Sequence, residues 1–360
     1  MALLTLARWL GPWADPTKAP AVSIADDALD GLRVRVFGRP GRSTFLIAPG
    51  LHYAGPDDPR MDRFCRVLAA AGHLVVAPYI PDYLALEPKA RAIADFTRVF
   101  DALPRWSDRL RTPYGSAVRR GEAGACARKP IVFSISFGSL LAFALAAERG
   151  DEIDRLVIFG GYADFHDTLR FCLTGEVASG RTAARDPLNQ PVVLMNLLDL
   201  IEHERAGRDA LVAGWRRYVE RTWGRPEMKV RERFVAIAHE LAPEIPEAVR
   251  ELFLVGIGAT PGASELAMPA LARFDASALD PTPYLPRVRG RVELVHGMDD
   301  DVIPFEQSHV LARQLANADV RVHVTGLYGH TGAQRPKLSA LAQELVTMVR
   351  VLRVLAARPG

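Results

Sequence analysis

The sequence predicts an α/β protein with a mostly parallel sheet covered by helices on both faces. Short runs of apolar and often β-branched residues, such as Leu74–Pro78 and Arg155–Phe159, have the composition of strands that are buried on both sides. These runs alternate with segments of helical periodicity, which favours parallel strands joined by helices. In the middle of the chain the alternation stops and only helical patterns occur. We therefore expect an α/β core formed by residues 1–162 and 287–360, with a helical cap inserted at 163–286.

Each expected element follows from its local pattern. After a proline-rich lead-in, apolar runs predict strands, and apolar residues at helical spacing predict helices. The expected strands are 32–37, 44–48, 74–78, a run that begins at 131, 155–159, 292–296 and 320–324. The expected helices are about 59–71, 88–103, one that follows Gly138, 191–202, 208–222, 230–241, 246–254, 305–315 and 338–355. The polar stretch 112–128 is expected to be an exposed loop.

Composition and charge argue against several classes of protein. The 360 residues carry a formal net charge of +3, and only five of the 45 basic residues are lysines. The chain has no dense basic tract, so we expect no nucleic acid binding. Cys65, Cys126 and Cys172 are far apart and form no Cys-x-x-Cys pair, which favours a reducing compartment over a disulfide scaffold or a zinc site. We expect a cytoplasmic protein that needs neither a metal nor a cofactor.

The N-terminal stretch Met1–Trp13 is apolar, with Arg8 as its one charged residue. It lacks the basic start and the small-residue cleavage site of a secretory leader. Across the chain, no apolar run reaches the roughly 18 residues that predict a membrane span. We expect a helix that docks on the domain or a frayed end, and contact with a membrane surface is the alternative.

The stretch around Ser136 has the pattern of a nucleophile elbow. An apolar strand that begins at Ile131 is followed, after only a few residues, by a buried helical segment from Leu140. So short a reversal requires small neighbours, and Ser134 and Gly138 occupy the two small positions. The usual pattern is Gly-x-Ser-x-Gly, and here Ser134 replaces the first glycine. Serine is still a small residue, so the substitution reduces only the conformational freedom of the backbone. The turn would hold Ser136 in a strained conformation with its side chain exposed above the sheet.

Two further loops carry an acid and a histidine after predicted strands. The acidic segment 297–304 follows the strand that ends at His296, and His330 follows the last strand. Because ligands bind at the carboxyl ends of parallel strands, both loops and Ser136 are expected at one edge of the sheet. The chain order Ser, Asp, His is that of an α/β-hydrolase triad. From about Leu32 to its C-terminus, the chain resembles the α/β-hydrolase superfamily.

The resemblance implies a role for each of these residues. Three motifs carry it: Ser134-Ile135-Ser136-Phe137-Gly138, His296-Gly297-Met298-Asp299-Asp300-Asp301-Val302-Ile303-Pro304 and Gly329-His330. In that superfamily the acid usually lies three residues after the glycine and four before the proline, and both counts select Asp300. The resemblance thus implies Ser136 as nucleophile, His330 as base and then acid, and Asp300 as the group that orients His330.

The oxyanion hole is expected from two backbone N–H groups. One belongs to Phe137, directly after the nucleophile, and the other comes from the loop after the strand 44–48. Aligning Pro49-Gly50 with the His-Gly of the superfamily gives Leu51 as the second donor. Pro49 replaces the histidine of that motif, so the chain departs from the pattern here.

Other residues compete for some of these roles. Asp299 and Asp301 are alternatives to Asp300, and they are also typical solvated carboxylates of a turn. Asp164 follows the preceding strand, where some members of the superfamily place the acid, but we expect it to be a helix N-cap. We expect His296 to be structural, buried beside the acidic loop.

A few remaining residues have both a functional and a structural interpretation. His52 and Asp57 match the His-x4-Asp spacing of some acyltransferases, but they lie in a Gly/Pro-rich loop, so we expect His52 instead to line a pocket. The aromatic residues of the insertion are expected to form the core of the cap, and Cys172 to be a small buried side chain. These aromatic residues are Trp215, Tyr218 and Trp223.

The sequence therefore predicts a serine hydrolase that cleaves a carboxylic ester or a related acyl substrate. A helical cap over the site would favour a small-molecule substrate with an apolar acyl group, because it would bury that group away from water. An acyltransferase or a C–C bond hydrolase with the same triad is the alternative. A non-catalytic binding protein that keeps the fold is a third hypothesis, and a missing triad residue would have favoured it.

Overall fold

The computed structural model describes residues 1–111, 129–326, 328–329, 332–333 and 341–358. Its contacts divide the chain into two compact units. The first comprises Met1–Ala163, Leu279–Met298 and Gln307–Gly360, and the second comprises Asp164–Ala278 and Asp299–Glu306. The predicted exposed loop 112–128 lies outside the described residues.

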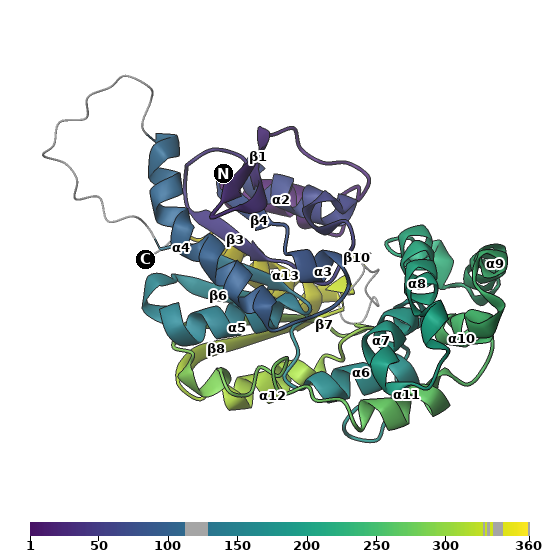
Figure 1. Ribbon diagram of the computed structural model, residues 1–360. Coiled ribbons are helices and arrows are strands. Elements are labelled where there is room, and N and C mark those ends of the chain that lie inside the picture. The colour runs from purple at the N-terminus through teal and green to yellow at the C-terminus, as the bar shows by residue number, and fades with distance from the viewer. Residues whose placement is uncertain (112–128, 327, 330–331, 334–340, 359–360) are drawn as a thin grey trace, which may run out of the picture. The chain divides into compact units, whose positions relative to one another are not determined.

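The first unit is built on an eight-stranded sheet (Figure 1). The strands are β1 (Ile24–Leu29), β2 (Leu32–Phe37), β3 (Thr44–Ala48), β4 (Leu74–Pro78), β5 (Ile131–Ile135), β6 (Arg155–Phe159), β7 (Gly290–Gly297) and β8 (Ala318–Thr325). Their order in the sheet is β1-β2-β4-β3-β5-β6-β7-β8. β2 is antiparallel to β1 and β4, and all other neighbouring pairs are parallel. The predicted mostly parallel α/β sheet is confirmed.

The edge strand β1 is an addition to the predicted strands. Nearly all of its residues are exposed, so it has no apolar alternation by which the sequence could indicate a strand. Charged pairs join it to β2 instead. Asp26 accepts hydrogen bonds from Arg33 at 2.8 Å and from Arg35 at 3.0 Å. Cross-strand ion pairs therefore support this edge where apolar contacts do not.

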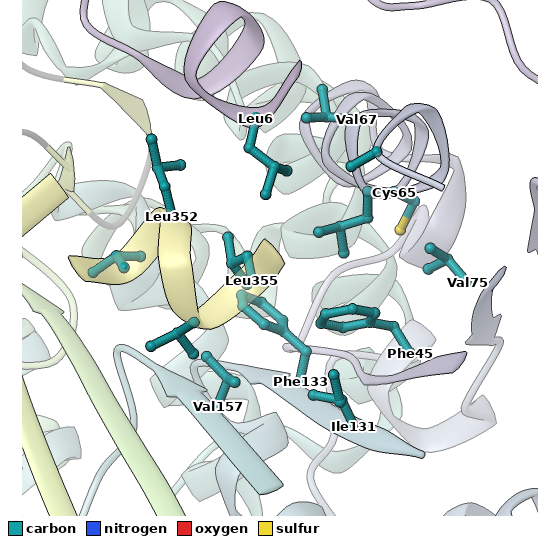
Figure 2. Packing of buried hydrophobic residues seen from close by; sticks show 14 of the residues in the cluster. Leu6, Phe45, Cys65, Val67, Val75, Ile131, Phe133, Val157, Leu352 and Leu355 are labelled. Atoms are coloured by element: carbon teal, nitrogen blue, oxygen red, sulfur yellow. The ribbon is translucent and has the colours of Figure 1, made fainter. Parts of the chain in front are cut away.

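The central strands place alternate side chains on opposite faces of the sheet. On one face, Phe45 and Ile47 of β3 and Phe133 of β5 belong to a buried apolar cluster (Figure 2). Helices α2 (Pro59–Ala70) and α13 (Leu341–Ala356) contribute further buried side chains to the same cluster. This face of the sheet is therefore covered by the first and the last long helices of the chain.

The N-terminal helix α1 (Ala2–Leu10) docks on this cluster, as predicted. It contacts α2 and α13, and Leu6 is fully buried together with Leu352 and Leu355 of α13 (Figure 2). Burying one leucine side chain in this way contributes about 1.5–3 kcal/mol. In the described ranges, no helix combines the length and the apolar composition needed to cross a bilayer.

The opposite face of the sheet is covered by helices α4 (Arg91–Arg111) and α5 (Gly138–Arg149), which contact each other. The prediction that the first of these helices ends at Leu103 was wrong, because α4 continues through Pro104. The indole N–H of Trp106, in the extension, donates to Asp27 of β1 at 2.6 Å, and the Trp106 ring is buried. These tertiary contacts compensate for the amide hydrogen that proline lacks. Helix α12 (Glu306–Gln314) lies between β7 and β8 in the chain.

The second unit is helical. Its helices are α6 (Phe165–Thr174), α7 (Gln190–Leu197), α8 (Arg208–Thr222), α9 (Arg231–Leu241), α10 (Glu247–Ile257) and α11 (Ala263–Leu271). Trp215 and Tyr218 of α8 are fully buried, which confirms the prediction that they are core residues. Trp223 is only partly buried, so the prediction was wrong for it. The Trp215 indole N–H donates to the carbonyl of Phe253 at 3.1 Å. Helix α11 contains Pro269, which obscures its helical pattern in the sequence. That this unit acts as a cap stays a prediction.

A buried histidine in the first unit makes the stability of the fold dependent on pH. His73 is fully buried, with Nδ1 2.5 Å from the Ser43 hydroxyl. Burial, assisted by the charges of Arg42 and Arg155, lowers the pKa of His73 from 6.5 to about 4. Between these two pH values the unfolded state therefore binds a proton that the folded state does not. Because this pKa is depressed on folding, the free energy of unfolding should fall as the pH decreases from 6.5 towards 4, by about 1 kcal/mol per pH unit from this group.

Urea unfolding of the wild type and of His73→Gln, measured at intervals between pH 6.5 and pH 4.5, tests this expectation. The variant should depend less steeply on pH than the wild type, because it has no imidazole to protonate. Parallel pH dependences for the two proteins would contradict it.

Candidate active site

The turn after β5 holds Ser136 in a left-handed backbone conformation. Its φ angle is +53°, and Asp30 and Leu86 are the only other non-glycine residues in the described ranges with a positive φ. Such a conformation costs roughly 1–3 kcal/mol for a residue with a side chain. β5 ends at Ile135 and α5 begins at Gly138, so Ser136 lies at the apex of a strand–turn–helix. This is the backbone geometry expected of a nucleophile elbow. The prediction that the Ser136 side chain is exposed was wrong: it is buried, because the loop after β3 runs against the turn at Gly50.

Close backbone contacts explain why the turn requires glycine. A Cβ atom on Gly138 would lie 2.2 Å from the carbonyl oxygen of Ala48 and 2.5 Å from that of Pro49, so no side chain fits there. A Cβ atom on Gly50 would lie 3.4 Å from the Cβ of Ser136. The loop that follows β3 therefore runs directly against the elbow, and both glycines make this approach possible.

Hydrogen bonds hold the elbow from two sides. The N–H of Ser136 donates to the carbonyl of Phe159, at the end of β6, at 2.8 Å. The hydroxyl of Tyr83, in the short helix α3 (Pro81–Leu84), donates to the carbonyl of Phe137 at 3.0 Å. Tyr83 is fully buried, and burial raises its pKa well above the ordinary value, so the hydroxyl keeps its proton. The turn is thus fixed by groups outside its own segment.

The two predicted oxyanion donors lie on the segments that meet at the elbow. Phe137 has helical backbone angles and directly precedes the first residue of α5, where the helix dipole favours negative charge. Leu51 belongs to the loop whose Gly50 lies against Ser136. The direction of either N–H toward a substrate stays a prediction.

Asp300 lies in the loop that follows β7, within the second unit. Its side chain is buried, and Oδ1 accepts hydrogen bonds from the N–H groups of Val302 and Ile303, each at 2.9 Å. Two such bonds fix the orientation of the carboxylate within the loop. Asp299, by contrast, is exposed. A buried, oriented carboxylate is what the proposed acid requires.

Two of the alternative residues have the structural roles that were predicted for them. Asp164 is the N-cap of α6, and its side chain accepts a hydrogen bond from the N–H of Asp167 at 2.7 Å. His296 is fully buried, with Nδ1 2.6 Å from the hydroxyl of Ser308. Cys172 is also buried, as predicted, and burial raises the pKa of its thiol to about 12. The thiol is therefore not ionised at neutral pH.

His330, the predicted base, lies outside the described residues. The residues on either side of it in the chain are described as β9 (Tyr328–Gly329) and β10 (Gly332–Ala333), which pair with each other in antiparallel fashion. β9 contacts β7, the strand that precedes the acidic loop. The role of His330 stays a prediction.

His52 pairs with a different carboxylate from the one that its sequence spacing suggested. Nδ1 of His52 accepts a hydrogen bond from the N–H of Ala54, and Nε2 lies 3.2 Å from the carboxylate of Asp58. Asp57 instead accepts a hydrogen bond from the hydroxyl of Tyr79 at 2.9 Å. Burial lowers the pKa of His52 to about 4, so the ring is neutral at pH 7. That His52 lines a substrate pocket stays a prediction.

Sequence analysis missed two residues that shape this region. Asp58 is the N-cap of α2 and accepts hydrogen bonds from the N–H groups of Arg60 and Met61. An aspartate directly before Pro59 is a recognisable helix start, so this role was predictable. Tyr83 is different, because its partner Phe137 is 54 residues away in the chain and no local pattern links them.

No protein-family model and no curated protein matches the chain. Among solved structures it is similar to an acylaminoacyl peptidase of Pyrococcus horikoshii, at a TM-score of 0.47 and 10% identity over 94% of this chain and 41% of the peptidase. It is also similar to a serine hydrolase from the polyaromatic hydrocarbon-degrading bacterium Cycloclasticus zankles. The TM-score is 0.46 and the identity 11%, over 93% of this chain and 99% of that hydrolase. A third similar structure is the 2-hydroxy-6-oxo-6-phenylhexa-2,4-dienoate hydrolase of Rhodococcus sp. strain RHA1. The TM-score is 0.45 and the identity 15%, over 93% of this chain and 99% of that hydrolase.

The chain spans about two fifths of the length of the peptidase that it resembles. All three TM-scores are below 0.5, so neither substrate nor activity follows from these likenesses. In the part of the chain that the structure describes, no group of three or more His, Cys, Asp or Glu side chains is arranged to hold a metal ion.

The contact between Tyr83 and the elbow leads to a prediction about stability. Tyr83→Phe removes one hydroxyl and leaves the buried carbonyl of Phe137 without that donor. We expect the free energy of unfolding to fall by about 1 kcal/mol. Tyr218→Phe is a matched control, because the buried Tyr218 hydroxyl has no hydrogen-bond partner within the described residues. Urea unfolding should show a loss for the first variant and none for the second, and equal effects would contradict the role of Tyr83.

Proposed function

We propose that this protein, in which a mostly parallel sheet leads into a strained turn at Ser136, is a serine hydrolase acting on a carboxylic ester or a related acyl substrate. The observation that carries this proposal is the φ angle of +53° at Ser136, between the end of β5 and the start of α5. Strain of this kind persists only where the surrounding structure enforces it, and strained residues cluster at active sites. In a nucleophile elbow this strain directs the serine side chain beyond the carboxyl end of the sheet.

In the proposed mechanism, the Oγ of Ser136 attacks the acyl carbonyl while His330 accepts the hydroxyl proton. The tetrahedral intermediate collapses to an acyl-enzyme, and His330 passes the proton to the departing alcohol. Water then attacks the acyl-enzyme, again with His330 as base, and releases the acid. Asp300 orients His330 and stabilises the imidazolium that forms in each half of the reaction.

The developing oxyanion is proposed to be stabilised by the N–H groups of Phe137 and Leu51. The position of Phe137 at the beginning of α5 supports this role, because a helix N-terminus favours negative charge. The contact of Gly50 with the elbow supports the role of Leu51, its neighbour in the chain. Loss of one such donor typically costs about 10²–10³ in rate.

We infer the substrate class from the expected cap. A helical unit of this size would exclude water from a bound acyl group, which favours small-molecule substrates with an apolar acyl part. The same triad also serves acyl transfer and C–C bond cleavage. Product analysis in the presence of an added alcohol separates hydrolysis from acyl transfer, because only a transferase converts the alcohol to an ester in preference to water.

Variants of the proposed nucleophile and base test the proposal. Ser136→Ala and His330→Ala should each lower kcat on p-nitrophenyl esters by about 10⁴-fold or more, because neither residue supports catalysis without the other. Ser134→Ala is the matched control: it removes a hydroxyl from the same turn and keeps a small side chain there, so activity should stay within a few-fold of the wild type. Circular dichroism would confirm that all three variants fold. Full activity in Ser136→Ala would refute the assignment, and absence of turnover by the wild type on all esters and thioesters would favour a binding protein.

A further inference from the structure

We propose that Lys229, in the helical insertion, is a positioning residue for the loop that carries Asp300. This inference rests on the proposed function, in which Asp300 is the acid of the triad. The proposal identifies residues of the insertion that hold the acid in place, and the sequence motifs do not indicate these residues. The evidence is a set of contacts made by residues 299–306 within the second unit.

The acidic loop leaves the sheet at a definite point. The N–H of Met298 donates to the carbonyl of Thr325 at 2.8 Å, so Met298 is still attached to the neighbouring strand β8. From Asp299 to Glu306 the contacts change, and these residues group with the helical insertion. Although Asp300 follows a strand of the sheet in the chain, its loop is held by residues that lie far away in the sequence.

The main attachment is an ion cluster built around Lys229. Its ammonium group lies 3.0 Å from the carboxylate of Asp186 and also contacts the carboxylate of Asp301. A backbone hydrogen bond accompanies it, from the N–H of Asp186 to the carbonyl of Asp301 at 2.7 Å. Asp186 is itself fixed, because its side chain also accepts a hydrogen bond from the N–H of Leu188. Lys229 therefore links Asp301 to the segment of the insertion that carries Asp186.

The charges in this cluster depend on the ammonium group. Burial lowers the pKa of Lys229, but the carboxylates of Asp186 and Asp301 more than offset this effect, so its pKa lies above the ordinary value and the lysine stays charged. Burial raises the pKa of Asp301, which means that its ionised form is sensitive to loss of a neighbouring cation. Without the ammonium, the buried carboxylate of Asp186 and the partly buried carboxylate of Asp301 would repel each other. We expect the backbone at Asp301 to move away from Asp186.

Asp300 directly precedes this anchored residue, and its own orientation depends on the same stretch of backbone. Its Oδ1 accepts hydrogen bonds from Val302 and Ile303, on the other side of Asp301. A second attachment to the insertion lies there too, because the thiol of Cys172 donates to the carbonyl of Val302 at 3.4 Å. A displacement of Asp301 would therefore disturb both the peptide before it and the bonds that orient the Asp300 carboxylate.

Lys229→Met tests the proposal, because it keeps the aliphatic stem and removes the ammonium group. If the carboxylate of Asp300 is misplaced, the imidazolium of His330 is less stabilised. We expect kcat on a p-nitrophenyl ester to fall by about 10- to 100-fold with little change in KM. We also expect the acid limb of the pH profile of kcat/KM to move to lower pH by about half a unit or more, because that limb reports the pKa of the base. Lys229→Arg keeps the positive charge and should restore most of the rate.

Two further variants serve as a positive and a negative control. Asp300→Asn should show the same direction of pH shift with a larger loss of kcat. Arg217→Met is the matched control, since Arg217 pairs with Glu244 inside the insertion and neither residue belongs to the acidic loop. It should leave both kcat and the pH profile as in the wild type. Should Lys229→Met fail to fold, Asp301→Asn removes one carboxylate from the cluster and should shift the acid limb in the same direction by a smaller amount.

The outcomes separate the two levels of inference. Loss of activity in Asp300→Asn together with an unchanged rate and pH profile in Lys229→Met and Asp301→Asn would overturn the role of Lys229 and leave the proposed function intact. A reduced kcat in Lys229→Met with an unmoved acid limb would also overturn it, because that pattern indicates only less folded enzyme. Full activity in Asp300→Asn would refute the acid assignment, and the proposal for Lys229 would fail with it.

Discussion

The site depends first on the absence of side chains where β5 turns into α5. Gly138 lies so close to the carbonyl groups of Ala48 and Pro49 that any Cβ atom would collide with them. This approach brings the loop after β3 against the elbow and leaves Ser136 with a positive φ angle. The strain of roughly 1–3 kcal/mol is offset by surrounding structure, namely the pairing of β5 with strands on both sides and the hydrogen bond from Tyr83.

The proposed nucleophile and the proposed acid are held by different kinds of interaction. Ser136 is fixed by close packing and by backbone hydrogen bonds of the parallel sheet, which are insensitive to pH. Asp300 is fixed by two backbone N–H groups and by a loop whose neighbour Asp301 pairs with Lys229. Charged contacts that are partly buried respond strongly to loss of one partner. We therefore expect the acid, rather than the nucleophile, to be the part of the site that substitutions in the insertion can disturb.

The sequence predicted the elements that local patterns define, and it did not predict the contacts between residues that are distant in the chain. Strands buried on both faces, such as β3 and β4, were predicted with their full bounds, because a continuous apolar run is a local pattern. β1 was not predicted because it is supported by cross-strand ion pairs with Arg33 and Arg35 and not by an apolar pattern. The continuation of α4 past Pro104 was not predicted because it depends on the hydrogen bond from Trp106 to Asp27 of β1. At the site, the elbow was recognisable from its small residues, whereas the contacts of Tyr83 and Lys229 join segments that are distant in the chain and have no local pattern.

The central claim is that the strained turn presents Ser136 as a nucleophile. Treating the intact protein with a fluorophosphonate probe, followed by digestion and peptide mapping, tests it most directly, because such probes form a covalent adduct only with an activated serine. We predict one stoichiometric adduct, located on Ser136 and blocked by prior incubation with an ester substrate. No adduct on the folded protein, or an adduct on another serine, would contradict the assignment of this turn as a catalytic elbow.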